Sequence, residues 1–427
     1  MSTMSIGLTI FGGMLALMVL RVPIAVSMFI PGAVGYIFLS GWMPLLGHLK
    51  GAVYGRVSAY DLSVIPLFML MGALAVNGGL SKALFEFANS LLGRFRGGMA
   101  MAGVLACAAF GAISGSTVAT TATIAQVAYP EMRRLKYSGR LATAALATGG
   151  TMGILLPPSV TLLVYAILTE QNITRIFLAA YVPAALAAIG YIAAIAIYVR
   201  LYPGHAPQAQ AVPRGEVGRT ALQVWPLVII FVAVFGGIYG GVFTPTEGAA
   251  IGAMLTFIAT LAKRKMSRRL FLDSVRITAQ TSGMIFMIFI GADMINAALA
   301  LSQLPAQLAA VIAEAQISPV LVMTAIMIFY IILGCVMDEM SMILLTVPVV
   351  FPVILGLDFY GLGSDDKAMW FGILILTVCA IGMIFQTFNL LSGFSALENV
   401  LAALMFSKVP PGKHQELAEA TLSRLGI

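Results

Sequence analysis

Long apolar runs separated by short polar segments make up most of this chain. The hydrocarbon core of a bilayer is roughly 30 Å thick, and an α-helix needs about 20 apolar residues to cross it. The sequence therefore predicts an all-α polytopic membrane protein. The predicted membrane-spanning helices lie at residues 5–20, 22–40, 62–77, 142–168, 177–200, 222–243, 245–262, 279–300 and 368–394.

Two further apolar runs, at residues 98–130 and 319–355, are too long for a single crossing. Each is interrupted in its middle by small or charged residues, which predicts a re-entrant hairpin whose two arms meet at a non-helical tip. Two other segments, 78–97 and 264–278, are amphipathic at helical spacing. Such segments are typical of helices that lie in the membrane interface.

The composition indicates that lipid is the surrounding solvent. Apolar residues make up 60% of the 427 residues, charged residues make up 10%, and the mean hydropathy is +1.00. Soluble domains carry about 25% charged residues. The formal net charge is +7, but no basic face with interleaved aromatic residues is present, so nucleic-acid binding is not indicated.

The basic residues instead form four short clusters between apolar runs, and such clusters usually remain in the cytoplasm. If all four are cytoplasmic, the first hairpin enters the membrane from the inside and the second from the outside. Hairpins of opposite orientation are the mark of an inverted repeat. The clusters are Arg94 and Arg96; Arg133, Arg134, Lys136 and Arg140; Arg200, Arg214 and Arg219; and Lys263, Arg264, Lys265, Arg268 and Arg269.

The two hairpins also share a sequence pattern. Phe110–Pro130 and Leu333–Pro352 both begin with an apolar residue and Gly, break at polar residues, continue with threonines and end on an aromatic residue and Pro. A second pair of segments follows in the same order, Gly153–Pro158 against Gly382–Thr387. The first match has an offset of about 223 residues, and two matches in the same order indicate a duplicated unit.

This repeat divides the chain into a first half at residues 1–202 and a second half at residues 221–407. The stretch 203–220 contains Pro, Gly, Ala and Gln and is the predicted linker. Residues 408–427 form a polar C-terminal tail.

Polar residues in the middle of the first hairpin predict a binding site. Ser114-Gly115-Ser116-Thr117 interrupts an apolar run, and non-helical backbone at membrane depth is tolerated only where protein or a water-filled cavity surrounds it. Carbonyls and hydroxyls at such a break are oxygen ligands for sodium, and helix N-terminal amides favour a carboxylate. Alternatively, these residues only allow close helix packing. The facing half of the site is predicted at the next break in the pattern, which contains Gly150, Thr151, Gly153, Pro157 and Pro158.

Acidic residues interrupt the second hairpin at Asp338 and Glu339. Carboxylates at membrane depth are unfavourable and are usually functional, although a hairpin tip that reaches water would also explain them. Asp293 fits a packed polar group and a role in coupling equally well. Glu247 predicts a helix cap, because it lies three residues after Thr244 with a Pro at the first helical position.

The chemistry of an enzyme is not indicated. The three cysteines have no CxxC spacing, and no histidine lies in a predicted span or hairpin. An enzyme within the membrane would need a nucleophile–base pair or a metal cluster there, so we expect neither an enzyme nor a metal cofactor.

Several of these stretches resemble the large membrane subunit of tripartite ATP-independent periplasmic (TRAP) transporters, of the dicarboxylate and sialic-acid type. They follow the expected order over roughly residues 1–384 and are specific together, although none is specific alone. The stretches are Ile65–Gly72, Gly111–Thr123, Gly153–Ser159, Thr244–Glu247 and Met337–Pro348.

The resemblance implies an elevator-type transport domain, made of two hairpins and two broken helices, that is carried on a scaffold. It implies sodium-coupled uptake of an organic acid, with sodium ions but no cofactor. One sodium site would lie at Ser114–Thr117 with Gly150–Gly153, and a second at Asp338–Ser341 with a break after Gly382. The substrate would lie between the hairpin tips.

The resemblance also implies two partners, a small four-helix membrane subunit and an extracytoplasmic substrate-binding protein. Such a complex would lie in the cytoplasmic membrane of a bacterium or archaeon. The soluble partner does much of the substrate selection in this family, so the particular carboxylate is not readable from this chain.

The sequence departs from the family where the second broken helix should read Pro-Pro-Val-Gly. It has Gln386, Thr387, Phe388 and Asn389 there, and the polar tail stands in place of the family's last membrane span. Either Gly382 with the side chains of Thr387 and Asn389 supplies replacement ligands, or the second sodium site is lost. A divergent subfamily and an altered reading frame would both give this pattern. An inactive or assembly-only subunit is therefore the alternative to an active transporter.

Overall fold

The computed structural model describes residues 3–20, 22–207, 215–264, 266–315, 317–334, 337 and 339–387, and these residues are helical with short connections and no strand. The helices of the first half are α1 (Thr3–Val19), α2 (Ile24–Ser40), α3 (Trp42–Ser58), α4 (Val64–Asn77), α5 (Leu80–Leu92), α6 (Gly98–Ser114), α7 (Thr117–Arg134), α8 (Gly139–Gly150), α9 (Met152–Leu155), α10 (Val160–Leu168) and α11 (Ile173–Leu201). Those of the second half are α12 (Glu216–Tyr239), α13 (Pro245–Ala262), α14 (Arg268–Leu301), α15 (Leu304–Glu314), α16 (Pro319–Gly334), α17 (Glu339–Gly356) and α18 (Ser364–Thr387).

Membrane-spanning length and composition recur throughout the described part of the chain. Seven of its helical units are long and apolar enough to cross a bilayer. Four shorter apolar helices, α1, α2, α6 and α16, accompany them. The prediction of an all-α polytopic membrane protein is confirmed.

The order of helices repeats between the two halves. A short helix, α5 or α15, precedes a pair of helices packed against each other, α6 with α7 or α16 with α17. A further helix follows each pair, beginning at Gly139 in the first half and at Ser364 in the second. Corresponding helices begin about 220 residues apart, as expected for a duplicated unit.

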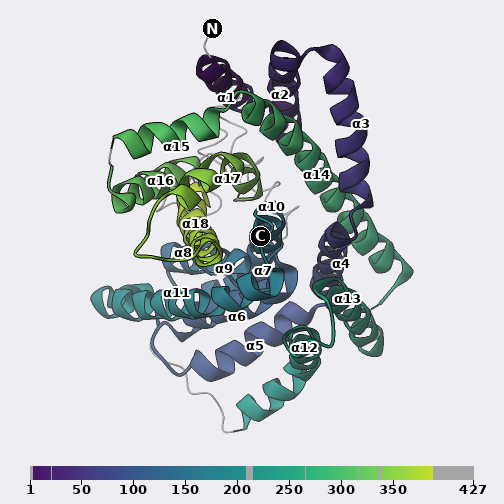
Figure 1. Ribbon diagram of the computed structural model, residues 1–427. Coiled ribbons are helices and arrows are strands. Elements are labelled where there is room, and N and C mark those ends of the chain that lie inside the picture. Colours follow the sequence, from purple (N-terminus) through teal and green to yellow (C-terminus); the bar gives the residue numbers. More distant parts are fainter. Residues whose placement is uncertain are drawn as a thin grey trace, which may run out of the picture.

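Two groups of helices can be distinguished in space. Helices α1 to α4 and α12 to α14 form an outer arc, and the hairpins lie inside it together with α8 to α10 and α18 (Figure 1). Helix α5 connects the arc to the first hairpin, and α15 connects it to the second (Figure 1). We call the outer arc the scaffold and the inner group the hairpin bundle.

Within the scaffold, helices of the first half pack against helices of the second half. Helix α2 of the first half packs along α14 of the second, and α13 of the second half packs along α4 of the first. Glycines allow the first of these contacts to be close, since a Cβ built at Gly32 would lie 2.7 Å from the backbone nitrogen of Ile295. At Gly291 a Cβ would lie 2.5 Å from the carbonyl oxygen of Ala25.

Two helices were not expected from the sequence. Helix α3 carries His48, Lys50 and Arg56 together with Gly and Pro, so its mean hydropathy is too low for a predicted span. Helix α15 is short, and it follows α14 after only two residues. Both helices become apparent only from the element order and the packing.

The prediction of a separate interfacial helix at 264–278 is wrong. Those residues contribute the start of α14, which continues without a break to Leu301. No Pro or Gly lies at the boundary between the amphipathic and the apolar part, so nothing ends the helix there. The predicted linker at 203–220 is also shorter than expected, because α12 begins at Glu216; residues 208–214 lie outside the described residues.

Candidate functional site

The tip of the first hairpin is a sharp break between two helices. Helix α6 ends at Ser114, and Gly115 follows in the left-handed conformation with φ +60°, which a residue without a Cβ adopts readily. Ser116 then caps α7, its hydroxyl accepting a hydrogen bond from the backbone N–H of Ala119 at 3.4 Å. The break predicted at Ser114–Thr117 is confirmed.

Oxygen atoms gather around this break. The hydroxyls of Ser114 and Thr120 lie 2.6 Å apart, and both side chains are buried. The neighbouring Gly153 lies against the tip, because a Cβ at Gly153 would be 3.2 Å from the carbonyl oxygen of Ser116. Hydroxyl and carbonyl oxygens that converge in this way are the ligand type that sodium prefers in transporters.

The helix that faces this tip is broken, as predicted. Helix α8 ends at Gly150, Thr151 caps it, and α9 covers only Met152–Leu155. Pro157 and Pro158 lie in the following non-helical stretch, where their missing N–H groups leave no donor for a helical hydrogen bond. Helix α10 then begins after Ser159, whose hydroxyl accepts from the N–H of Leu162 at 3.2 Å.

Close packing joins the broken helix to the hairpin. A Cβ at Gly111 would lie 2.6 Å from the Cα of Gly153, and a Cβ at Gly150 would lie 1.7 Å from the hydroxyl oxygen of Thr121. These glycines therefore allow close helix packing, and close packing is also the alternative interpretation of the hairpin tip at Ser114–Thr117. Packing and binding are compatible, since the same contacts bring the oxygen atoms together.

The tips of the two hairpins meet. The hydroxyl of Thr117, at the start of α7, donates a hydrogen bond to Glu339 Oε1, at the start of α17, at a distance of 2.5 Å. The two residues are 222 positions apart in the sequence. The structure thus brings together one predicted site residue from each half.

The structure describes only some of the other site residues that are predicted in the second half. Ser341 is fully buried on α17, one turn before Leu345. Gly382 and Thr387 lie within α18. Asp338 and Asn389 lie outside the described residues.

The break predicted after Gly382 is wrong as far as the description reaches. Helix α18 runs from Ser364 to Thr387 without interruption. Gln386 and Thr387 both retain an N–H group, unlike the prolines of the first half, so the helical hydrogen bonds continue through this segment. A continuous helix uses its carbonyls internally and has none to offer to an ion.

A second contact between the halves, which the sequence did not reveal, joins α10 to α18 within the hairpin bundle. The hydroxyl of Tyr165 on α10 donates to the carbonyl oxygen of Ala368 on α18 at 2.6 Å. Its ring fills the space beside Gly372, where a Cβ would lie 2.3 Å from a ring carbon. No short-range pattern signals this contact, because it joins residues 203 positions apart.

Asp293 and Glu247 have structural partners. Asp293 on α14 forms a bidentate ion pair with Arg56 on α3, with both N–O distances at 2.6 Å. This pairing supports a packed polar group over a role in coupling. Thr244 and Glu247 form the predicted capping box at the start of α13.

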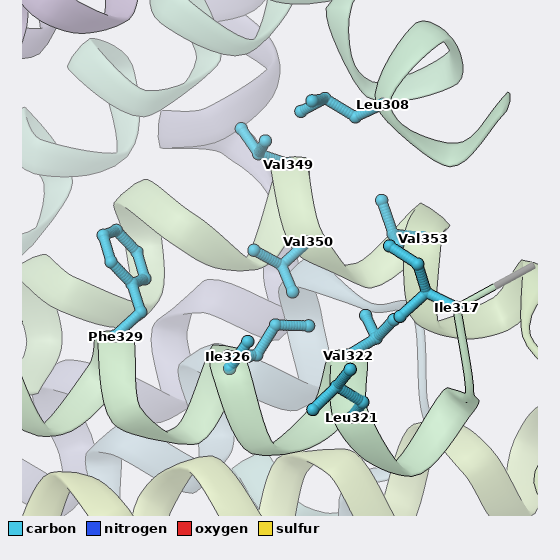
Figure 2. Close-up of a pocket in the computed structure, with 10 residues that line it drawn as sticks. Leu308, Ile317, Leu321, Val322, Ile326, Phe329, Val349, Val350 and Val353 are labelled. Carbon is cyan, nitrogen blue, oxygen red and sulfur yellow. The ribbon is translucent and has the colours of Figure 1, made fainter. Parts of the chain in front are cut away.

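A cavity lies at some distance from this chemistry, between α15 and the second hairpin (Figure 2). Its volume is about 450 Å³, and Leu308, Phe329 and Val350 are among its lining residues. All the lining side chains are apolar. The cavity therefore offers no ligand to sodium or to a carboxylate.

Two repeated hairpins whose tips meet beside a broken helix, all held by a helical scaffold, define a class of membrane transport protein. The comparison with known families specifies the class further. The model of the family described as "Tripartite ATP-independent periplasmic transporter, DctM component" matches residues 11–385. The chain belongs to this family, and it is a multi-pass protein of the bacterial inner membrane. The match ends at the residue before Gln386, where the sequence departs from the family pattern.

Similar proteins include a "C4-dicarboxylate TRAP transporter large permease protein DctM" from Pseudomonas aeruginosa, 33% identical over 71% of each chain. Another is an "Isethionate TRAP transporter permease protein DctMQ" from Oleidesulfovibrio alaskensis, 28% identical over 88% of this chain and 58% of that one. Among solved structures, the Alcanivorax borkumensis YdaH transporter is similar with a TM-score of 0.54, 13% identity, and coverage of 91% of this chain and 87% of that one. This last similarity concerns the fold alone.

Proposed function

We propose that this chain is the translocating subunit of a sodium-coupled importer for a small organic anion. The observation that carries the proposal is the meeting of the two hairpin tips through Thr117 and Glu339. A substrate bound between them would contact both halves at once. Such a site is reached from either side of the membrane when the hairpin bundle moves relative to the scaffold.

The first half supplies the proposed sodium site. Ser114, Ser116 and Thr120 place hydroxyl oxygens at the tip, and Gly153 brings the broken helix within reach of the Ser116 carbonyl. Sodium bound here would stabilise the tip in the geometry that accepts the anion. Coupling follows because sodium and substrate each bind better when the other is present.

The hairpin bundle is the proposed moving part. It is joined to the scaffold in sequence through the short helices α5 and α15 and through α11, which leads from α10 toward α12 (Figure 1). In an elevator-type transporter, such connecting helices would allow the bundle to move as a body while the scaffold remains in place. Because helices of both halves pack against each other in the scaffold, the scaffold is a suitable fixed frame.

The substrate class and the partners are proposed from the relatives. The names of these relatives specify a C4-dicarboxylate for one and isethionate for another, and both are small organic anions. The second relative is named DctMQ and is longer than this chain, which supports a companion membrane subunit for a chain of this length. A soluble extracytoplasmic binding protein is the second proposed partner.

Uptake into proteoliposomes tests the proposal. The chain is reconstituted with its small membrane subunit, the binding protein is added outside, and labelled succinate and isethionate are supplied with and without an inward sodium gradient. We expect uptake of one of these anions that depends on sodium. Equal uptake with sodium and with potassium would contradict sodium coupling.

An assembly-only subunit is the second candidate. The family match ends at residue 385, and α18 continues without a break to Thr387. A chain of this kind would co-purify with the small membrane subunit and show no uptake of any anion. Co-purification together with uptake excludes it.

A further inference from the structure

Thr117 and Glu339 hold the same place in the two halves. Thr117 is the first residue of α7, and Glu339 is the first residue of α17. When two repeats are related by an approximate twofold axis, equivalent residues contact each other only beside that axis. The hydrogen bond between them therefore marks the point where both hairpins converge, which is also where the proposed function places the substrate.

The contact joins a hydroxyl to a carboxylate that belongs to the protein itself. Thr117 is 4% exposed and Glu339 is half-buried, so the hydrogen bond is partly shielded from solvent. An organic acid brings the same kind of acceptor. A threonine hydroxyl has a single proton, so it cannot donate to Glu339 and to a substrate carboxylate at the same time.

We propose that Glu339 is an internal competitor of the substrate, and this inference rests on the proposed function. Its carboxylate holds the Thr117 hydroxyl while the site is empty, and the carboxylate of the organic acid takes that hydroxyl when the substrate binds. The hairpin tips are then joined directly only in the empty site. An empty site closed in this way suppresses movement of sodium without substrate.

Two substitutions separate competition from a simple latch. Glu339→Gln keeps the size of the side chain and an oxygen that accepts from Thr117, but a neutral amide is the weaker acceptor. The substrate then displaces it more easily, and KM for uptake falls by about three- to tenfold. Thr117→Val removes the donor from both carboxylates, so the loss in the empty site offsets the loss in the occupied site, and KM stays within about twofold of the unaltered value, as it does in Thr117→Ser.

A contact that only held the hairpins together would lower KM in both variants, because the substrate would lose nothing with the Thr117 hydroxyl. A fall in KM in both variants, or no fall in Glu339→Gln, overturns the proposal. Glu131→Gln is the matched control, because it removes a carboxylate at the far end of α7, where Glu131 pairs with Arg134. An equal fall in KM in this control would assign the effect to net charge and would also overturn the proposal.

The measurement uses the reconstituted complex with whichever of succinate and isethionate gives the higher uptake, at saturating sodium. Absence of sodium-dependent uptake in the unaltered chain refutes the proposed function and leaves a separate test of competition. In that test equilibrium binding of labelled succinate and isethionate to the purified complex is compared between the unaltered chain, Glu339→Gln and Thr117→Val. Tighter binding in Glu339→Gln with nearly unchanged binding in Thr117→Val supports the competition. Binding that is not tighter in Glu339→Gln, or equally tighter in both variants, overturns it.

Discussion

The broken helix of the first half and helix α18 of the second occupy the same place in the repeat, yet within the described residues only the first of them is interrupted. Between Gly139 and Leu168 the chain forms three helices, whereas α18 runs unbroken from Ser364 to Thr387. The sequence difference is small, because Pro157 and Pro158 correspond to Gln386 and Thr387. The prolines account for the break after α9, and without them the helical hydrogen bonds continue along α18.

The difference makes the two halves chemically unequal. The first half has a broken helix packed through glycines against a hydroxyl-rich hairpin tip. The second half contributes a carboxylate, Glu339, at its tip and a continuous helix behind it. We infer that the first half carries the sodium site and that the second half acts mainly on the substrate.

The largest effect is expected where the broken helix meets the hairpin. Gly111→Ala places a Cβ 2.6 Å from the Cα of Gly153. The Cα belongs to the backbone and the Cβ is bonded directly to it on the other helix, so neither atom can rotate away. We expect a loss of about 1–3 kcal/mol in stability and loss of most sodium-dependent uptake. Thermal unfolding of the purified protein and uptake measure the two effects.

Gly190→Ala on α11 is the control for this prediction, since nothing lies within 4 Å of a Cβ built there. Alanine favours a helix over glycine, so we expect unchanged or slightly raised stability. Similar losses in both variants would show that the close contact at Gly111 is not what matters.

The second prediction gives the broken helix of the first half the two residues that α18 has at the corresponding positions. Pro157→Gln combined with Pro158→Thr gives the first half the residues of α18 and allows α9 and α10 to join into one helix. We expect uptake to lose its sodium dependence while the protein remains in the membrane. Sodium titration of uptake, with abundance measured on the same vesicles, gives the result. Unchanged sodium dependence would mean that the break does not form the sodium site.

The reciprocal exchange, Gln386→Pro with Thr387→Pro, tests the second half. If a sodium site has been lost there, a new break would raise the sodium affinity or the number of sodium ions moved per substrate. Comparing sodium and substrate fluxes in the same vesicles gives that number. If the unaltered chain already moves its substrate with full coupling and the prolines abolish uptake, our alignment of α18 with the first broken helix is incorrect.

Features that depend on a few neighbouring residues can be predicted from the sequence, whereas contacts between residues far apart in the chain cannot. Local patterns of Gly, Pro and hydroxyl residues predict the break in the first hairpin, the first broken helix and the capping box at Thr244, and the structure confirms all three. Helix α3 is not predicted because its charged residues lower its mean hydropathy, although one of them, Arg56, pairs with Asp293 of another helix. The site's central contact was also beyond reach, since the sequence indicated both Thr117 and Glu339 but not that they touch.

A third prediction concerns the hydroxyls of the two hairpins. Ser116→Ala removes the N-cap of α7 and a proposed sodium ligand, so the sodium concentration for half-maximal uptake should rise by about three- to tenfold. Ser341→Ala on α17 should leave it nearly unchanged if the first half alone carries the sodium site. Unaltered sodium dependence in both Ser114→Ala and Ser116→Ala would remove the site from the first hairpin. A larger effect of Ser341→Ala would reverse the assignment of the two halves.

The smallest effect is expected in the scaffold, where the halves also differ. Helix α3 has no separate counterpart in the second half, because α13 is followed directly by α14. Its ion pair with α14 is partly exposed, with side-chain accessibilities of 31% for Arg56 and 15% for Asp293. Solvent weakens such a pair, so we expect Arg56→Gln and Asp293→Asn each to lower stability by about 1 kcal/mol, with a smaller combined loss than the sum.

The exposed pair of Lys82 and Glu86 on α5, 3.8 Å apart, is the control for this comparison. Its double-mutant cycle should give a coupling near zero, because both side chains are well solvated. Sodium dependence should be unchanged in all of these variants, since Asp293 is held by Arg56 and serves to fix α3. A raised sodium requirement in Asp293→Asn, with stability intact, would instead give Asp293 a part in coupling. The scaffold would then contribute to the sodium site, and the contrast between the two hairpins would no longer account for coupling by itself.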